Sequence, residues 1–255
     1  MSTAYLITAI LVFSRFSGFI GFLPAIGFKT IPVMTKILLI VCLTIVVLPV
    51  VPEAPPYPTL GILSVGIFME FFFGMLMSWV VNLVFAGLIT GTELISTQIG
   101  QAAAKQFNPS MNVSQSPLGG MAVLLAMAAF MGANLHLLMI KILADSFQSL
   151  PPGNVGNVLE AAKIWVVYSN VVLISAVKIA GPILTLVLLN NSFLAVLSRL
   201  APNMNVFFSV GFLVSMIGGL ILFGILFPNI IEYALKLSFD AMVNMRDMIE
   251  RASGS

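Results

Sequence analysis

Residues 60–104 read LGILSVGIFMEFFFGMLMSWVVNLVFAGLITGTELISTQIGQAAA, and no proline interrupts the chain between Pro58 and Pro109. An α-helix over the whole stretch would be on the order of 65 Å long. That is about twice the ~30 Å thickness of the hydrocarbon core of a bilayer. The stretch therefore predicts a long apolar helix that bends, breaks at Gly87 or Gly91, or projects beyond a membrane.

The composition is that of a chain that does not face water. Of its 255 residues, 60% are hydrophobic and 8% are charged, whereas about 25% of the residues of an ordinary soluble domain are charged. We expect the chain to lie in lipid, inside a protein complex, or both. The net charge of +2 gives no indication of nucleic-acid binding. The single cysteine, Cys42, cannot form a disulfide within the chain.

About six apolar segments follow one another along the chain. They lie near residues 4–23, 37–51, 60–87, 118–140, 164–189 and 206–235. A helix needs about 17 to 25 apolar residues to span a bilayer, and only the second segment is clearly too short. We therefore expect an all-α fold of membrane-associated helices. The first segment lacks a basic start and a small-residue cleavage site, so we expect it to be retained as a helix.

The loop charges give a weak indication of membrane orientation. With the N-terminus outside, the inner loops would carry four basic residues and the outer loops two, which favours this arrangement. The charged segment 236–251 would then lie outside, and this weakens the preference.

Four charged residues interrupt apolar sequence: Arg15, Glu70, Glu93 and Lys178. An ionised group that faces lipid costs at least ~2.5 kcal/mol, so such groups usually face a bundle interior or an aqueous cavity. They could line a conduit or an ion path. They could instead be paired charges that fix how helices assemble, and this reading is favoured for each residue singly. A proton relay is less well supported, because His136 is the only histidine and lies at a segment end.

Gly87 and Gly91 form a G-x-x-x-G step, which permits the close approach of another helix. Packing within the chain is the favoured reading of this short motif.

The motifs of common enzymes are missing from the sequence. It has no G-x-S-x-G, no HExxH and no phosphate-binding glycine loop. One histidine and one cysteine cannot by themselves form a zinc site of histidine and cysteine ligands. We expect no enzymatic activity, no cofactor and no metal.

A long polar loop, KQFNPSMNVSQSPLGG at residues 105–120, separates two apolar segments. A much shorter connection would join two helices, and long loops are often functional or disordered. Phe107 and Met111 are apolar residues within it. An ordinary long connector remains the alternative to a functional loop.

These landmarks resemble the FliR/SctT family of type III export-gate proteins. The central match, within residues 69–120, comprises Glu70, Gly74, Gly91, Ile95, Gln98, Gly100, Pro109 and the run Gln115-Ser116-Pro117. Further matches lie at residues 14–32, 144–153 and 198–212, in the order typical of the family. Two departures occur: Asn108-Pro109 stands where the family has Asp-Pro, and the glycine–histidine step is stretched to Gly132–His136.

The resemblance implies a non-enzymatic subunit of the export gate, made of tilted helical hairpins. One copy would assemble with FliP-like and FliQ-like subunits into a helical pore, with an FlhB-like protein at its entrance. Unfolded flagellar proteins would pass through this pore. Residues 1–160 would resemble a FliP-like subunit and residues 161–255 a FliQ-like one, within a single export-gate subunit. The gate would lie in the bacterial inner membrane, at the flagellar basal body, with part of it raised towards the periplasm.

In this family the loop that corresponds to residues 106–116 projects into the pore and helps to plug it. The resemblance therefore predicts a plug made of Gln106, Phe107, Asn108, Pro109, Ser110, Met111, Asn112, Val113, Ser114, Gln115 and Ser116. Apolar side chains in such a loop would block water and ions. A secondary transporter and a purely structural assembly nucleator remain alternative functions.

Overall fold

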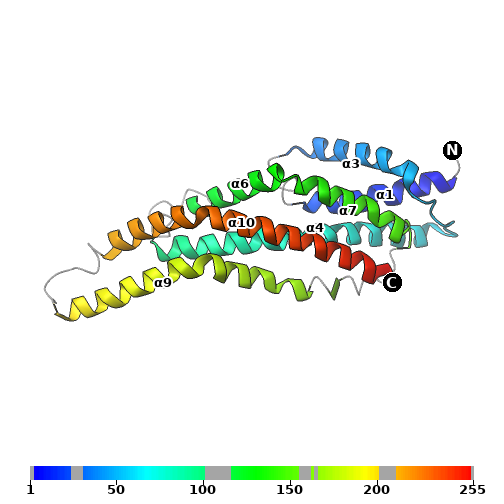
Figure 1. Cartoon of the computed structure of the whole chain (residues 1–255). Coiled ribbons are helices and arrows are strands. Elements are labelled where there is room, and N and C mark those ends of the chain that lie inside the picture. The colour runs from blue at the N-terminus through cyan, green and yellow to red at the C-terminus, as the bar shows by residue number, and fades with distance from the viewer. Residues whose placement is uncertain are drawn as a thin grey trace. The chain divides into compact units, whose positions relative to one another are not determined.

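Every described element of the chain is helical. The structure is a computed structural model, and it describes residues 3–23, 31–100, 116–154, 162–163, 166–200 and 211–253. The helices, shown in Figure 1, are α1 (Thr3–Phe22), α3 (Val33–Val47), the short 3-10 helix η1 (Leu48–Val50), α4 (Leu60–Gln98), α6 (Pro117–Gly132), α7 (Leu135–Ser149), α9 (Asn170–Leu200) and α10 (Phe212–Ser253). The predicted all-α class is confirmed.

Helix α4 is continuous over 39 residues, so it does not break at Gly87 or Gly91. It starts after Thr59, whose side-chain oxygen accepts a hydrogen bond from the Ile62 N–H at 3.4 Å. It ends before Gly100, which has a φ of +87°. Glycine adopts this left-handed conformation without the penalty that a side chain brings, and it therefore ends helices. At 1.5 Å per residue the helix is about 58 Å long.

The apolar segment predicted near 118–140 is helical, but it is not one continuous helix. The chain forms two helices there, α6 and α7, bent at the intervening residues. Asn134 immediately precedes α7 and has a φ of +56°. A left-handed residue cannot continue a right-handed helix, so the apolar run is interrupted although its composition stays uniform.

Helices α9 and α10 extend beyond the apolar segments that the sequence suggested. Each carries an internal proline, Pro182 in α9 and Pro228 in α10. The charged segment 236–251 is part of α10 and not a separate tail. By length and composition five helices could each span a membrane, and a sixth span results if α6 and α7 count as one. About six apolar segments were predicted.

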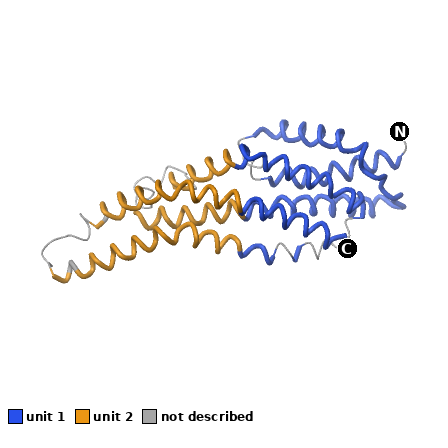
Figure 2. Tube along the Cα trace, in the orientation of Figure 1, with its two compact units in different colours: residues 1–83, 130–170, 237–255 blue, residues 84–129, 171–236 orange. Residues whose placement is uncertain are grey.

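The chain divides into two compact units, coloured separately in Figure 2. Unit 1 comprises residues 1–83, 130–170 and 237–255, and unit 2 comprises residues 84–129 and 171–236. In unit 1, α3 packs on α1, and buried phenylalanines form much of the core: Phe16, Phe19, Phe73, Phe130 and Phe147. In unit 2, the buried residues include Leu88, Ile95, Ile99, Ile183 and Val187. The division into halves near residue 160 stays a prediction.

Candidate functional site

Arg15 of α1 and Glu70 of α4 form an ion pair inside unit 1. Arg15 Nε lies 2.5 Å from Glu70 Oε2, and Arg15 Nη2 lies 3.1 Å from Glu70 Oε1. Both side chains are 0% exposed. This two-point contact matches the planar guanidinium to the carboxylate. Two of the charges predicted to be sheltered from lipid are therefore each other's partners within the chain.

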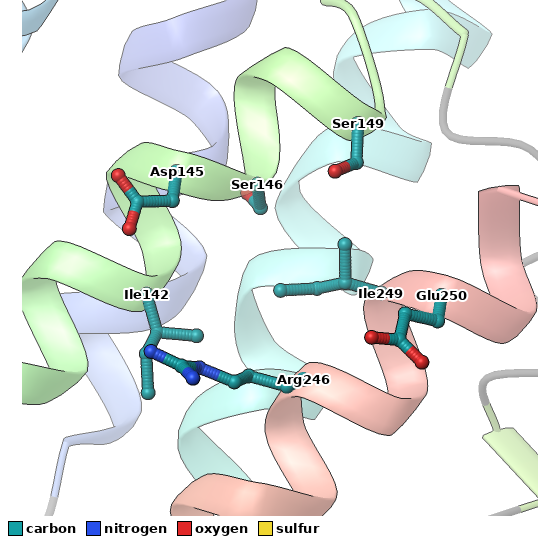
Figure 3. A pocket seen from close by; sticks show the side chains of 7 residues that line it. All are labelled: Ile142, Asp145, Ser146, Ser149, Arg246, Ile249 and Glu250. Atoms are coloured by element: carbon teal, nitrogen blue, oxygen red, sulfur yellow. The ribbon is translucent and has the colours of Figure 1, made fainter.

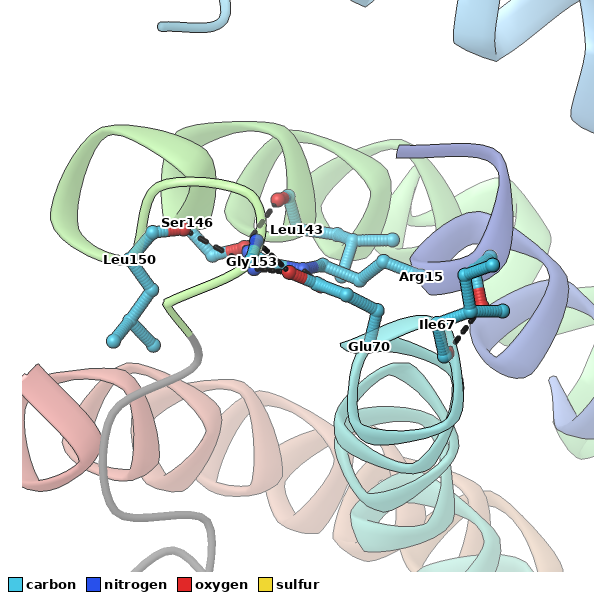
Figure 4. A network of polar contacts seen from close by, with 8 residues as sticks. Arg15, Ile67, Glu70, Leu143, Ser146, Leu150 and Gly153 are labelled. Carbon is cyan, nitrogen blue, oxygen red and sulfur yellow. Dashed lines mark hydrogen bonds and ion pairs between the residues drawn. The ribbon is translucent and has the colours of Figure 1, made fainter. Parts of the chain in front are cut away.

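The remaining donors of Arg15 reach α7 and the turn that follows it, as Figure 4 shows. Nη1 donates to Ser146 Oγ at 3.0 Å, and Nη2 donates to the Leu150 carbonyl at 3.1 Å. The guanidinium also lies 4.2 Å from the ring centre of Phe147, a favourable position for a cation. A single side chain thus joins three parts of unit 1: α1, α4 and the end of α7.

Glu70 has a further partner in the same turn. Its Oε1 accepts a hydrogen bond from the Gly153 N–H at 2.8 Å. Gly153 has a φ of +86°, and a Cβ there would come within 2.1 Å of the Tyr57 hydroxyl oxygen. Glycine is therefore required at this position both by the backbone and by the neighbouring side chain.

Two glycines allow α1 and α4 to approach closely enough for the ion pair to form. A Cβ on Gly18 would lie 2.0 Å from the Phe71 carbonyl oxygen, and one on Gly74 would lie 2.1 Å from the Arg15 carbonyl oxygen. Neither backbone oxygen can move away easily. The contact is reciprocal, since each helix presents a glycine to the backbone of the other.

The G-x-x-x-G step packs against α9 inside unit 2. A Cβ on Gly87 would lie 2.0 Å from Ser175 Oγ, and one on Gly91 would lie 3.0 Å from Ile179 Cβ. Both glycines thus approach α9 closely, and packing within the chain as the role of the motif stays a prediction.

Glu93 lies one helical turn before the end of α4 and contacts the start of α6. Its Oε1 accepts a hydrogen bond from the backbone N–H of Ser116. Ser96, on the same face of α4, is 2.8 Å from Ser116 through their side-chain oxygens. These contacts join the last turns of α4 to Ser116, the residue that precedes α6.

Lys178 differs from the other three charges because it is exposed in the chain. Its Nζ lies 5.6 Å from the ring centre of Tyr233 on α10. Beside it is an apolar pocket of about 180 Å³, which Pro182 and Leu226 also line.

Unit 1 contains a polar pocket of about 210 Å³ between α7 and α10. Figure 3 shows Asp145, Ser146 and Ser149 from α7 on one side, with Arg246 and Glu250 from α10 on the other. The lining mixes acids and a base, so the pocket has no single charge preference. Among the described residues no group of three or more His, Cys, Asp or Glu could hold a metal ion.

Most of the predicted plug lies outside the residues that the structure describes. This applies to Gln106–Gln115, whereas Ser116 is described and is 3% exposed. No sequence pattern indicated Ser96, which joins the polar cluster around Glu93 and Ser116, or Ser146, which joins the cluster around Arg15. The Ser116-Pro117 step was a signal for the first cluster, since serine before proline often starts a helix.

Comparisons with known proteins agree over most of the chain. A family model described as "Bacterial export proteins, family 1" matches residues 6–241. The Flagellar biosynthetic protein FliR of Pectobacterium carotovorum is 29% identical over 95% of this chain and 93% of its own length. The protein of the same name in Escherichia coli K12 is 25% identical, over 92% and 90%. The Surface presentation of antigens protein SpaR of Salmonella typhimurium is 26% identical, over 92% and 88%.

Proposed function

This chain belongs to the bacterial export proteins, family 1, and on that basis we propose that it is a non-enzymatic subunit of a type III protein export gate. Its similarity to FliR proteins supports a role as a component of the flagellar export apparatus, and its long apolar helices support a location in a membrane. In the finer proposal it forms a channel with FliP-like and FliQ-like subunits, beside an FlhB-like protein. Unfolded flagellar proteins cross the inner membrane through that channel.

The observation that supports a multi-subunit gate best is the character of the exposed helix surfaces. The candidate span Val33–Val50, which comprises α3 and η1, is the most apolar of the candidate spans, and 11% of it is buried. Its exposed residues include Val33, Met34, Leu38 and Val46, which suit lipid. Helix α9 exposes Lys178 and Asn191 along with its apolar residues. Polar groups of this kind are costly against lipid tails, so protein neighbours or an aqueous lumen suit α9 better.

In this proposal residues 106–116 close the channel at rest. Proline and asparagine favour a non-helical loop, and Phe107, Met111 and Val113 supply apolar atoms that exclude water and ions. Support for the plug comes from the family resemblance and from the length of the loop. Ser116, its last residue, is held on α4.

The proposal is tested in two steps. The tagged chain, co-expressed with FliP-like and FliQ-like subunits, should co-purify with both from membranes. Deletion of residues 108–114 should then raise the leak of small ions through the assembled complex. Failure of the subunits to co-purify contradicts the gate, and an unchanged leak through an intact complex contradicts the plug.

The buried ion pair gives no support to a secondary transporter. Arg15 and Glu70 neutralise each other and are fully enclosed, so neither is available to bind a solute from an aqueous cavity. A transporter would move a solute when the chain alone is reconstituted into vesicles. A pure assembly nucleator would leave the leak unchanged after any alteration of residues 106–116.

A further inference from the structure

A groove between α7 and α10 in unit 1 has an apolar part and a polar part. The apolar part is a pocket of about 190 Å³, and its lining includes Leu138, Phe239 and Val243. The polar part is the pocket of about 210 Å³ shown in Figure 3. Ile142 and Arg246 line both pockets. The two pockets are therefore neighbouring parts of one groove.

The lining changes from apolar to polar in the same direction along both helices. On α7 it passes from Leu138 to Asp145, and on α10 it passes from Phe239 to Glu250. Phe239 is 54% exposed and Val243 is 49% exposed, so the chain itself does not cover the apolar part. An uncovered apolar surface with polar residues at its edge is typical of a binding site. The groove matches an occupant that is apolar at one end and polar at the other.

The polar part of the groove presents both signs of charge. Figure 3 shows the Arg246 guanidinium extending from α10 towards Ile142 on α7, with Asp145 one turn further along α7. Both charged side chains are exposed, and neither forms an ion pair with another described residue. Glu250 adds a second carboxylate to the lining. Guanidinium groups bind phosphate well, and carboxylates bind ammonium groups. The pocket thus suits a group that carries both charges.

The floor of the polar part is fixed by the ion-pair network of unit 1. Ser146 lines this part and is 1% exposed. Its hydroxyl accepts a hydrogen bond from Arg15 Nη1 at 3.0 Å and donates one to the Leu143 carbonyl at 2.6 Å. The floor is therefore already satisfied within the chain and held in place, as in most small-molecule sites. Recognition of an occupant falls to the charged side chains at the sides of the groove.

We propose that this groove binds a zwitterionic phospholipid. Its phosphate contacts Arg246, its ammonium group contacts Asp145, and one acyl chain lies along Phe239. An anionic phospholipid suits the groove less well, because it lacks the ammonium group and leaves Asp145 and Glu250 unpaired beside its negative charge. The amphipathic helix of another protein also suits it less well, because such a helix has its polar and apolar residues on opposite faces and not at opposite ends. The inference goes beyond the proposed export function and does not depend on residues 106–116.

The test measures lipid binding to the full chain purified from membranes, by native mass spectrometry. The probes are phosphatidylethanolamine and phosphatidylglycerol with identical acyl chains. Phosphatidylethanolamine should bind about tenfold more tightly, the factor expected for one hydrogen bond to a charged group. Arg246→Gln should weaken the binding of both lipids about tenfold, since both carry the phosphate. Asp145→Asn should weaken only the binding of phosphatidylethanolamine and so remove the preference.

Two matched controls change the same charges outside the groove. Asp247→Asn and Arg251→Gln alter exposed residues of α10 that line neither pocket, and both should leave the two affinities unchanged. Val243→Trp fills the apolar part of the groove from an exposed position. It should weaken the binding of both lipids equally and keep the preference for phosphatidylethanolamine.

Two results would overturn the proposal. The first is equal affinity of the unaltered chain for the two lipids, or control variants that weaken binding as much as Asp145→Asn and Arg246→Gln. The second is occupation of the groove by a partner subunit. In that case Val243→Cys, in a Cys42→Ser background, would cross-link to a co-purified FliP-like or FliQ-like subunit, and the complex would retain no phosphatidylethanolamine at this groove. Neither result concerns ion leak, so the proposed gate is tested separately.

Discussion

Arg15 on α1 and Glu70 on α4 are 55 residues apart in sequence, yet Arg15 Nε lies 2.5 Å from Glu70 Oε2. Both side chains are completely buried. Removing two charges from water is costly, and only close geometry with further hydrogen bonds compensates for it. Ser146, Leu150 and Gly153 provide those further bonds. The pair therefore holds unit 1 in one arrangement through a network that no single helix contains.

Breaking the pair from one side should be strongly destabilising. Glu70→Gln keeps the volume but leaves the Arg15 charge buried without its counter-ion. We expect a loss of about 3–5 kcal/mol in the free energy of unfolding, measured by denaturant titration in detergent. The double variant Arg15→Met/Glu70→Met removes both charges and should lose less than Glu70→Gln alone. A Glu70→Gln chain as stable as the original would contradict the account of the network.

The close approach of α1 and α4 predicts a sharp difference between two glycines of α4. Gly74→Ala places a methyl group 2.1 Å from the Arg15 carbonyl oxygen, so α1 must move and the chain should lose about 3 kcal/mol. Gly61→Ala is the matched control, because no atom lies within 4 Å of its added Cβ. It should change stability by about 1 kcal/mol or less, towards higher stability. Equal thermal midpoints for the two variants would show that the helices do not cross at Gly74.

Because α4 packs on α9 at Gly87, we expect a second substitution, at Ser175, to restore part of the stability that a substitution at Gly87 removes. Gly87→Ala brings a methyl group within 2.0 Å of Ser175 Oγ and should cost about 1–3 kcal/mol. Ser175→Ala removes that oxygen, so the double variant should recover part of the loss. Thermal unfolding of the two single variants and the double variant measures this coupling. Strict additivity of the two changes would mean that the residues are not neighbours.

The raised pKa of Tyr57 leads us to expect that the folded chain loses stability at alkaline pH. Burial, and then the negative charge of Glu70, raise the pKa of the Tyr57 hydroxyl above the ordinary value of 10.0. The folded chain thus holds the proton more tightly than the unfolded chain. The stabilisation from Tyr57 is fully present below the unfolded pKa and is lost as the pH rises through the folded pKa.

Tyr57→Phe should flatten this part of the pH dependence. The Tyr57 hydroxyl is a buried oxygen for which the described residues provide no hydrogen-bond partner, so its removal should cost little at neutral pH. Thermal midpoints of both chains between pH 8 and about pH 11.5 provide the measurement. A steeper decline for Tyr57→Phe than for the original chain would reverse the predicted sign.

The sequence predicted the long helix from residue 60 because proline is absent there and the residues are apolar throughout. It did not predict the break before Leu135. The break occurs because Asn134 has a left-handed conformation, and this conformation does not change the hydropathy of the sequence. It also placed the end of α9 too early, since the polar residues that follow Leu189 are still helical. Local composition predicts where a helix can form, but its ends depend on what it packs against.

For the candidate site, the sequence identified Arg15, Glu70, Glu93 and the glycine step as unusual in apolar surroundings. It did not pair Arg15 with Glu70 or assign Glu93 to Ser116. A charged residue in an apolar helix indicates that its side chain has a partner or a polar environment. Which residue is the partner depends on how the helices cross.

The amino-acid sequence alone determined that this chain is helical, apolar and built in the order typical of its family, because these properties reside in neighbouring residues. Only the tertiary structure decided that Arg15 meets Glu70, that Gly87 faces α9 and that Glu93 caps α6. Each of these contacts joins residues at least 23 positions apart. Such contacts arise only when packed helices bring distant side chains within hydrogen-bonding or van der Waals distance.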